Sequence, residues 1–196
     1  SYTPYQAEVS QGRLEALMNF QTAISDLTAL PLANCSLLDE ATAAAEAINM
    51  MYALRTREQQ KSEANVVFID EQIFPQTLAV IQTRVIPQGI IIETGKYKEF
   101  DFTSNVFACV LQYPNSAGNV EDYRAFTEKA HAANCKVAVA ADIMSLVILT
   151  PPGEWGADIV FGSSQRLGTP MFYGGPSAAF FATRDEYKRN IPGRII

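Results

Sequence analysis

Residues 156–176 read GADIVFGSSQRLGTPMFYGGP, a short apolar segment that leads into a polar loop. Its residues 158–161, DIVF, are mostly β-branched or aromatic and are bounded by glycines, which predicts a buried strand. In open α/β sheets, ligands bind in the loops beyond the carboxyl ends of the strands. We therefore expect Gln165 and Arg166, which follow this strand, to lie at a site.

The chain downstream of this strand indicates a change of strand direction. The next apolar run, residues 178–182, is separated from Phe161 by 16 residues that are rich in glycine and proline and lack a helical pattern. A parallel neighbour would need a long crossover connection, usually a helix. An antiparallel final strand is therefore favoured.

Upstream, short apolar runs alternate with segments of helical periodicity. The expected strands cover residues 66–69, 90–92, 106–111 and 137–141, and the expected helices cover 7–29, 36–52, 74–85 and 121–134. Alternation of this kind, with nearly continuous apolar strands, is typical of a parallel sheet covered on both faces. The predicted fold class is α/β, with three layers and a mostly parallel sheet that contains one antiparallel strand.

The second expected helix has a clear start signal and a distinctive face. Ser36 and Asp39 form an S-x-x-D capping pattern, which predicts that the helix begins at Ser36. Alanines dominate one face of the segment that follows. We therefore expect this helix to pack closely against the sheet.

Length and charge restrict the class of protein. With 196 residues and 48% hydrophobic content, the chain can form one α/β domain over residues 1–196. The net charge of −6, with no basic run, argues against nucleic acid and anionic membranes as partners. The chain starts without methionine and ends on an apolar pair, so we expect it to be a fragment of a longer chain.

Few residue types suited to catalysis or metal binding are present. Cys35, Cys109 and Cys135 are odd in number and lack metal-ligand spacing, which indicates a reducing compartment and no zinc site. His131 is the single histidine, so a two-histidine metal site cannot form, and no Ser-His-Asp arrangement is recognised in the sequence. We expect His131 to be a solvated surface residue.

Two strings carry a resemblance to a known family. Residues 3–22, TPYQAEVSQGRLEALMNFQT, and residues 156–176 resemble the P-protein of the glycine cleavage system, a pyridoxal-phosphate-dependent glycine decarboxylase. The chain looks like its amino-terminal half or subunit 1. The resemblance implies the large domain of fold-type I pyridoxal-phosphate enzymes, followed by a smaller carboxyl-terminal domain that is absent here. It also implies decarboxylation of glycine and transfer of the aminomethyl group to the lipoyl H-protein.

The polar loop departs from the family pattern at the decisive position. The half that carries the cofactor has a His-Lys pair here, whereas this chain has Gln165 and Arg166. A Schiff base needs an amine that can lose its proton, and a guanidinium stays protonated at ordinary pH. The resemblance thus implies no catalytic residue and no cofactor on this chain, with pyridoxal phosphate on the partner half or subunit 2.

The remaining residues of the vestigial pocket are assigned from the resemblance. Asp142, after residues 137–141, corresponds to the acid that bonds the cofactor's pyridine nitrogen; alternatively, it caps the next segment or pairs with Arg166. Ser36 and Asp39 lie where a helix terminus would hold the phosphate. There Leu37 and Leu38 would block the anion, and Asp39 would repel it. Residues 113–118 form a turn that the resemblance places at the pocket rim.

Two alternative functions remain open. The chain could be a catalytic domain that uses another lysine; the candidates are Lys61, Lys96, Lys98, Lys129, Lys136 and Lys188. It could also be a regulatory module that binds a small anion through Arg166 in the vestigial pocket. The expected location is the cytoplasm of a bacterium, or the mitochondrial matrix if the source is eukaryotic.

Overall fold

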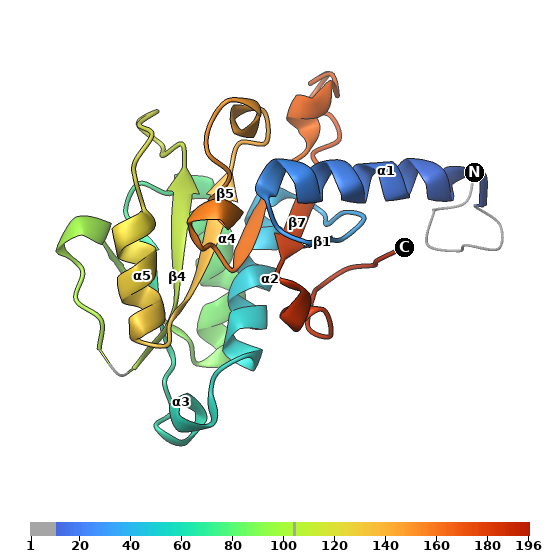
Figure 1. Ribbon diagram of the computed structural model, residues 1–196. Helices are drawn as coiled ribbons and strands as arrows, with labels where there is room; N and C mark the ends of the chain where they lie inside the picture. The colour runs from blue at the N-terminus through green and yellow to red at the C-terminus, as the bar shows by residue number, and fades with distance from the viewer. Residues whose placement is uncertain (1–10, 104) are drawn as a thin grey trace.

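The computed structural model describes residues 11–103 and 105–196, and its centre is one seven-stranded sheet (Figure 1). The strand order is β1-β7-β6-β5-β4-β2-β3. The strands are β1 (Leu32–Ala33), β2 (Val66–Asp70), β3 (Ile91–Gly95), β4 (Val106–Tyr113), β5 (Lys136–Ala141), β6 (Ile159–Ser163) and β7 (Ala179–Thr183). β7 is antiparallel to both β1 and β6, and the pairs from β6 to β3 are parallel. The single antiparallel strand is the predicted one.

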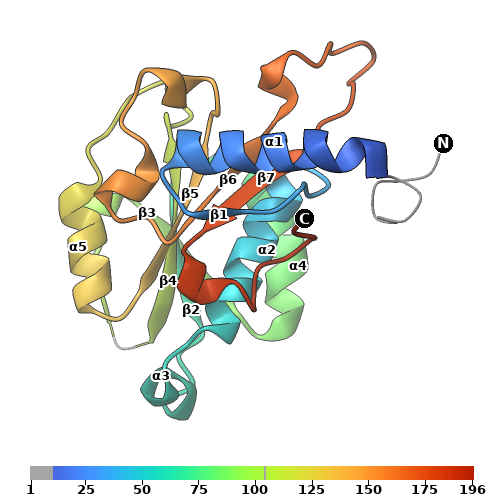
Figure 2. The same cartoon turned by 45° about the vertical axis from the view of Figure 1, so that its right-hand side comes forward.

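Helices cover both faces of the sheet, as the alternating pattern predicts. The α-helices are α1 (Gln11–Thr28), α2 (Glu40–Ala53), α3 (Arg57–Lys61), α4 (Pro75–Val85) and α5 (Arg124–Ala132). Figure 2 shows α2 and α4 on one face of the sheet and α1 and α5 on the other. Two apolar cores result, one on each face. The three-layer α/β prediction is therefore confirmed.

Short 3₁₀ helices complete the connections. They are η2 (Ile86–Gln88), η3 (Tyr97–Glu99), η4 (Ser145–Val147), η5 (Pro152–Trp155), η6 (Gln165–Leu167) and η7 (Asp185–Tyr187). η6 is the only regular element described between β6 and β7. The 3₁₀ turn is too short to cross the sheet, so the chain returns alongside β6 in the opposite direction.

The second helix begins later than the capping pattern predicts. Its N-cap is Asp39, whose Oδ1 accepts a hydrogen bond from the Thr42 backbone N–H at 2.7 Å, while Thr42 Oγ1 accepts one from the Asp39 N–H at 3.3 Å. Leu37 exchanges two backbone hydrogen bonds with Ala179 of β7. Because this bridge holds the chain extended, the helix cannot start at Ser36, and the prediction of that start is wrong.

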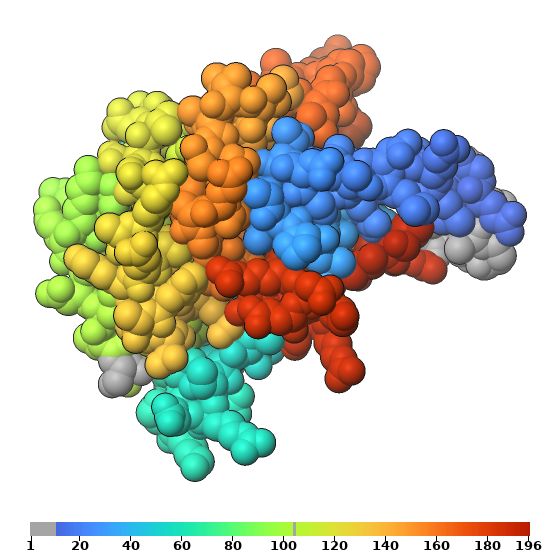
Figure 3. All heavy atoms as spheres, viewed as in Figure 1, coloured from blue at the N-terminus to red at the C-terminus, as the bar shows by residue number. Residues whose placement is uncertain are grey.

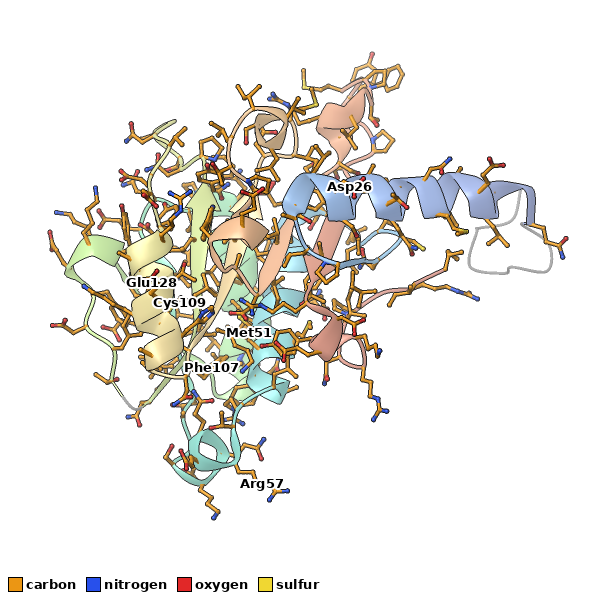
Figure 4. The ribbon with its side chains drawn as sticks, viewed as in Figure 1. Asp26, Met51, Arg57, Phe107, Cys109 and Glu128 are labelled. Atoms are coloured by element: carbon orange, nitrogen blue, oxygen red, sulfur yellow. The ribbon has the colours of Figure 1, made fainter. Side chains whose placement is uncertain are left out.

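The alanine-rich face of α2 packs against the sheet as predicted. Ala43, Ala44 and Ala47 are fully buried in the core between α2 and the strands. Met51 and Phe107 lie in the same core in Figure 4, where Arg57 on α3 extends into solvent instead. Small side chains let the helix axis approach the sheet closely, so a larger side chain on this face would overpack the core.

The first helix packs against the body only through its carboxyl-terminal part. Along the predicted inward stripe, Ile24 and Thr28 are buried and Leu14 and Leu17 are half-buried. Met18 is 54% exposed, so the prediction is wrong at that position. Figure 3 shows α1 projecting from the main body. Near its middle, the Gln21 Oε1 atom accepts a hydrogen bond from the Ile196 N–H at 2.9 Å. The helix start expected at residues 7–10 lies outside the described residues, as do Tyr5 and Gln6 of the family-like string.

Candidate functional site

A cavity of about 330 Å³ lies at the carboxyl edge of the sheet, where the polar loop was expected to form a site. The ends of β4, β5 and β6 supply most of its wall, and the first residue of α2 supplies another part. The cavity is lined by Glu40, Phe74, Gln112, Pro114, Asn115, Ala141, Asp142, Ser163, Gln165 and Arg166. The parallel strands end side by side here, which is why residues distant in sequence converge.

Asp142 and Arg166 form an ion pair across this cavity. Arg166 Nη2 lies 3.5 Å from Asp142 Oδ2, and the arginine side chain is 64% exposed. Asp142 Oδ1 also accepts a hydrogen bond from the Met144 backbone N–H at 3.2 Å. Asp142 therefore both caps the following segment and pairs with Arg166. These are the two roles predicted from the sequence as the alternative to bonding a cofactor.

Gln165 is held beside this pair by the loop itself. Its side-chain Nε2 donates to the Gly174 carbonyl oxygen at 3.3 Å, and its backbone N–H donates to Ser163 Oγ at 3.2 Å. Gly175 has a φ of +63°, and a Cβ on it would lie 2.5 Å from the Pro170 carbonyl oxygen. The loop thus needs glycine at this position in order to fold back over Gln165.

Glu40 is a pocket residue that the sequence reasoning missed. It is the first residue of α2, one position beyond the cap, and its Oε1 atom is buried without a hydrogen-bond partner. Burial, together with the nearby carboxylates of Asp142 and Asp39, raises the pKa of Glu40 to about 7, although a backbone hydrogen bond at Ser163 opposes this shift. Nothing in the local pattern distinguishes Glu40 from an ordinary first-turn acid.

Gln112 is the second missed residue. It lies in β4, is 2% exposed and reaches the cavity from the sheet. Its Nε2 donates to the Ala140 carbonyl oxygen at 3.3 Å, which orients the amide, while its Oε1 is buried and has no partner. The available signal in the sequence was a single polar residue, Gln112, directly after the apolar run of residues 106–111.

Ser36 and Asp39 do not line the cavity, although the resemblance places them in the vestigial pocket. Asp39 is occupied in capping α2. Leu37 is held against β7, and Leu38 is 75% exposed. The pocket wall at this end is Glu40 rather than either leucine.

The turn after β4 does lie at the pocket rim. Pro114 and Asn115 line the cavity, and Asn115 Oδ1 accepts hydrogen bonds from the backbone N–H groups of Ala117 and Asn119 at 3.1 and 2.9 Å. Asn115 therefore stabilises the turn through local hydrogen bonds, and the turn also lies at the rim of the cavity, as the resemblance implied.

At the opposite edge of the sheet, Asp158 organises a second polar cluster. His131 Nε2 lies 2.8 Å from Asp158 Oδ2, and Arg184 Nε lies 3.1 Å from Oδ1. The carboxylate also accepts the Val137 backbone N–H at 2.8 Å. The histidine side chain is 35% exposed, so it reaches the surface as predicted, but it is paired with a buried carboxylate, which the prediction missed. Its partner comes from another element, 27 residues away in sequence.

The residues at the main cavity do not fit covalently bound pyridoxal phosphate. Arg166, in the place of the lysine, cannot form the Schiff base, and none of the six lysines lines the cavity. The α2 terminus is capped by Asp39, and Glu40 brings a further carboxyl group. Among residues 11–103 and 105–196 there is also no group of three or more histidine, cysteine or acidic side chains placed to hold a metal ion. None of the helices described there has the length and apolarity needed to span a bilayer.

The fold and the place of the cavity define a class of protein. The mixed sheet with helices on both sides is that of the fold-type I pyridoxal-phosphate enzymes. A solved cystathionine gamma-lyase from Lactobacillus plantarum, complexed with L-serine, aligns with a TM-score of 0.67 over 85% of this chain and 42% of that chain. Its sequence identity is 16%, so this likeness concerns the fold alone.

Sequence comparison identifies the family. The family model of the glycine cleavage system P-protein matches residues 1–196, so the chain belongs to that family. The glycine dehydrogenase (decarboxylating) of Bacteroides fragilis is 81% identical over 196 residues, and that of Flavobacterium johnsoniae is 56% identical. In both cases the match covers all of this chain and 21% of the relative. A crystal structure of an inhibitor-bound glycine decarboxylase (P-protein) has a TM-score of 0.87 and 37% identity, covering 100% of this chain and 44% of that chain.

Proposed function

We propose that this chain is a non-catalytic part of a glycine dehydrogenase (decarboxylating), the P-protein of the glycine cleavage system. In this proposal, the chain forms one α/β domain over residues 1–196 that serves as scaffold and interface. The complete protein decarboxylates glycine with pyridoxal phosphate and passes the aminomethyl group to the lipoyl H-protein. Because the chain spans only about a fifth of its curated relatives, the rest of the machinery lies elsewhere in the complete protein.

One observation carries the non-catalytic part of this proposal. At the carboxyl edge of the sheet, Arg166 is paired with Asp142 and no lysine lines the cavity. In this proposal, the acid that would bond a pyridine nitrogen is thus paired with the residue that stands in place of the cofactor amine. Pyridoxal phosphate would then be held by the partner half or subunit 2.

Two further features support the scaffold role. An apolar core lies on each face of the sheet, which suits a domain that holds other parts of the protein in place. Met171, Phe172 and Tyr173 of the loop after β6 are 74%, 81% and 109% exposed, which is unusual for large apolar side chains and suits burial against a partner. The relatives are bacterial, so we place the complete oligomeric enzyme in the bacterial cytoplasm.

The test uses the complete protein that contains this chain. The protein is saturated with pyridoxal phosphate, reduced with borohydride, digested and analysed by mass spectrometry. We expect one stoichiometric adduct on a lysine outside this chain. An adduct on Lys61, Lys96, Lys98, Lys129, Lys136 or Lys188 would contradict the proposal and support a catalytic domain with another lysine.

A double variant, Gln165→His with Arg166→Lys, asks whether the missing amine is the sole obstacle. We expect this variant to gain no tight cofactor site, because Asp39 still caps α2 and Glu40 still lines the cavity. The matched control is Arg166→Ala, which removes the guanidinium without adding an amine. Saturable cofactor binding by the double variant but not by the control would show that the rest of the pocket remains competent.

The small-anion alternative has one observation in its favour, the 64% exposure of Arg166. Two carboxyl groups, those of Asp142 and Glu40, oppose it from within the same cavity. An anion would have to approach both. The two carboxyl groups therefore argue against a simple anion as the ligand of this cavity.

A further inference from the structure

Two buried oxygen atoms at the main cavity have no hydrogen-bond partner within the described residues. They are Glu40 Oε1 and Gln112 Oε1, which come from α2 and from β4 and belong to side chains that line the same cavity. The large majority of buried side-chain polar atoms in native proteins have a hydrogen-bond partner, because an unpaired one costs free energy. Two unpaired acceptors in one cavity indicate that a donor belongs there.

The orientation of the Gln112 amide strengthens this reading. Its Nε2 is engaged with the Ala140 carbonyl oxygen, so the oxygen is the free end of the amide. Because Gln112 is 2% exposed, bulk water does not serve this atom. A ligand that satisfies it must carry a hydrogen-bond donor into the cavity.

The charges around the cavity are arranged asymmetrically. Glu40 and Asp142 contribute carboxyl groups, and Arg166 contributes one guanidinium, so the acids outnumber the base among the lining residues. The deeper acceptors, Glu40 Oε1 and Gln112 Oε1, are buried, whereas the Arg166 side chain is 64% exposed. Its contact with Asp142 is long, 3.5 Å, and a guanidinium has five donors, which leaves capacity for another acceptor.

We propose that this cavity binds a small α-amino-acid zwitterion, with its ammonium group directed to Glu40 and Gln112 and its carboxylate to Arg166. An ammonium group supplies three donors, enough for both orphan acceptors. A carboxylate matches the planar fork of the arginine. The cavity volume of about 330 Å³ is at the small end for ligand pockets and suits a compact molecule. This inference rests on the proposed function in that it needs the cavity to be free of pyridoxal phosphate.

Ligands with only one of the two charges fit less well. Acetate or phosphate would face the carboxyl groups of Glu40 and Asp142, and Asp39 already occupies the α2 terminus that could have held a phosphate. A simple amine would satisfy the inner acceptors and leave Arg166 unused. The zwitterion is the class that uses both ends.

The binding test must separate this cavity from the catalytic one. The complete protein is loaded with pyridoxal phosphate and reduced with borohydride, which fixes the cofactor to its lysine and closes that site to added amino acids. Radiolabelled glycine is then measured by equilibrium dialysis, with methylamine, acetate and inorganic phosphate as competitors. We expect one saturable glycine site per chain, with each competitor at least about tenfold weaker, or 1.4 kcal/mol. Absence of saturable binding, or displacement by acetate or phosphate at comparable concentration, would overturn the proposal.

Variants then locate the site on this chain. We expect Glu40→Gln, Gln112→Leu and Arg166→Ala each to weaken glycine binding about tenfold or more. Glu46→Gln is the matched control, because Glu46 lies on the same helix and pairs with Arg84 at 2.7 Å on the surface. Circular dichroism checks that each variant is folded. Unchanged affinity in all three pocket variants, with the fold retained, would place the glycine site elsewhere and refute the assignment.

The same reduced sample distinguishes the two proposals. Peptide masses report where pyridoxal phosphate is attached, and dialysis reports whether glycine binds. An adduct within residues 1–196 refutes the non-catalytic role itself. An adduct elsewhere without glycine binding refutes only the zwitterion site.

Discussion

The two polar clusters at opposite edges of the sheet differ in how completely they are satisfied. At the amino edge, both oxygens of Asp158 are engaged, Oδ2 by His131 and the Val137 N–H, and Oδ1 by the Tyr187 hydroxyl and the Arg184 ion pair, although Arg184 Nε itself makes no hydrogen bond. At the carboxyl edge, Glu40 Oε1 and Gln112 Oε1 have no partner in the described chain. Figure 1 shows how the strands run from one edge to the other between the helices.

This difference separates a structural network from a ligand site. A buried carboxylate whose two oxygens are both engaged holds elements together, here α5 with the start of β6 and the end of β7. Buried acceptors left without donors cost free energy and are retained where a ligand supplies the donor. Three variants test the comparison, beginning with the cluster that should matter most for stability.

Asp158→Ala is expected to have the largest effect. It leaves Arg184 without its carboxylate and removes the acceptor of the Val137 N–H, both in a largely buried setting. Because the side chains of His131 and Arg184 are each 35% exposed, water compensates part of the lost pairing, and we expect a loss of roughly 2–3 kcal/mol of unfolding free energy. Urea unfolding measures the loss. The matched control is Asp185→Ala, whose pair with Lys188 at 3.5 Å is exposed and should contribute less than about 1 kcal/mol. Equal effects of the two variants would show that the Asp158 cluster is not a structural network.

Glu40→Gln should change the pH dependence of stability. Below about pH 4.5, the Glu40 carboxyl is protonated in both the folded and unfolded chains and has no effect. As pH rises toward 7, the unfolded chain releases this proton and the folded chain retains it, so the wild-type protein loses stability. The expected loss is on the order of 2 kcal/mol relative to Glu40→Gln, which has no such group.

The measurement is urea unfolding of both proteins between pH 4.5 and pH 8. Glu128→Gln serves as the control, because Glu128 is exposed on α5 (Figure 4) and should leave the pH profile unchanged. Parallel pH profiles for wild type and Glu40→Gln would contradict the burial of an ionisable carboxyl at the cavity.

Arg166→Ala should have the smallest effect on stability. Its pair with Asp142 is long and its side chain is 64% exposed, so the contribution is expected to stay within about 0.5 kcal/mol. Thermal or urea unfolding measures it. A cost as large as that of Asp158→Ala would mean that the carboxyl-edge pair is structural and would weaken its assignment to ligand binding.

Much of the fold follows from local pattern. Apolar runs such as residues 66–69 and 137–141 are long enough and β-branched enough to specify strands, and β7 is antiparallel because residues 162–177 lack a crossover helix. The start of α2 could not be read in this way. Both Ser36 and Asp39 are good caps, and only the bridge of Leu37 to β7 determines which one is used.

The candidate site was half predictable. Gln165 and Arg166 were found because they follow an apolar strand, and strand ends converge at one edge of a parallel sheet, whereas Asp142 was assigned from the family resemblance. Glu40 and Gln112 were not found, because their role depends on burial and on missing partners, and the one local signal was the polar Gln112 at the end of an apolar run. The pairing of His131 with Asp158 was missed because it joins residues that are distant in sequence.

The sequence by itself determined the family and the α/β class, since motif identity and hydrophobic periodicity are local properties. Only the tertiary structure decided which polar groups are paired and which are left for a ligand. Pairing depends on distances between elements far apart in the chain, such as β4 and α2 at the cavity or α5 and β6 around Asp158. Burial then gives these distances their energetic weight, because an unpaired polar group costs little in water and much inside a protein.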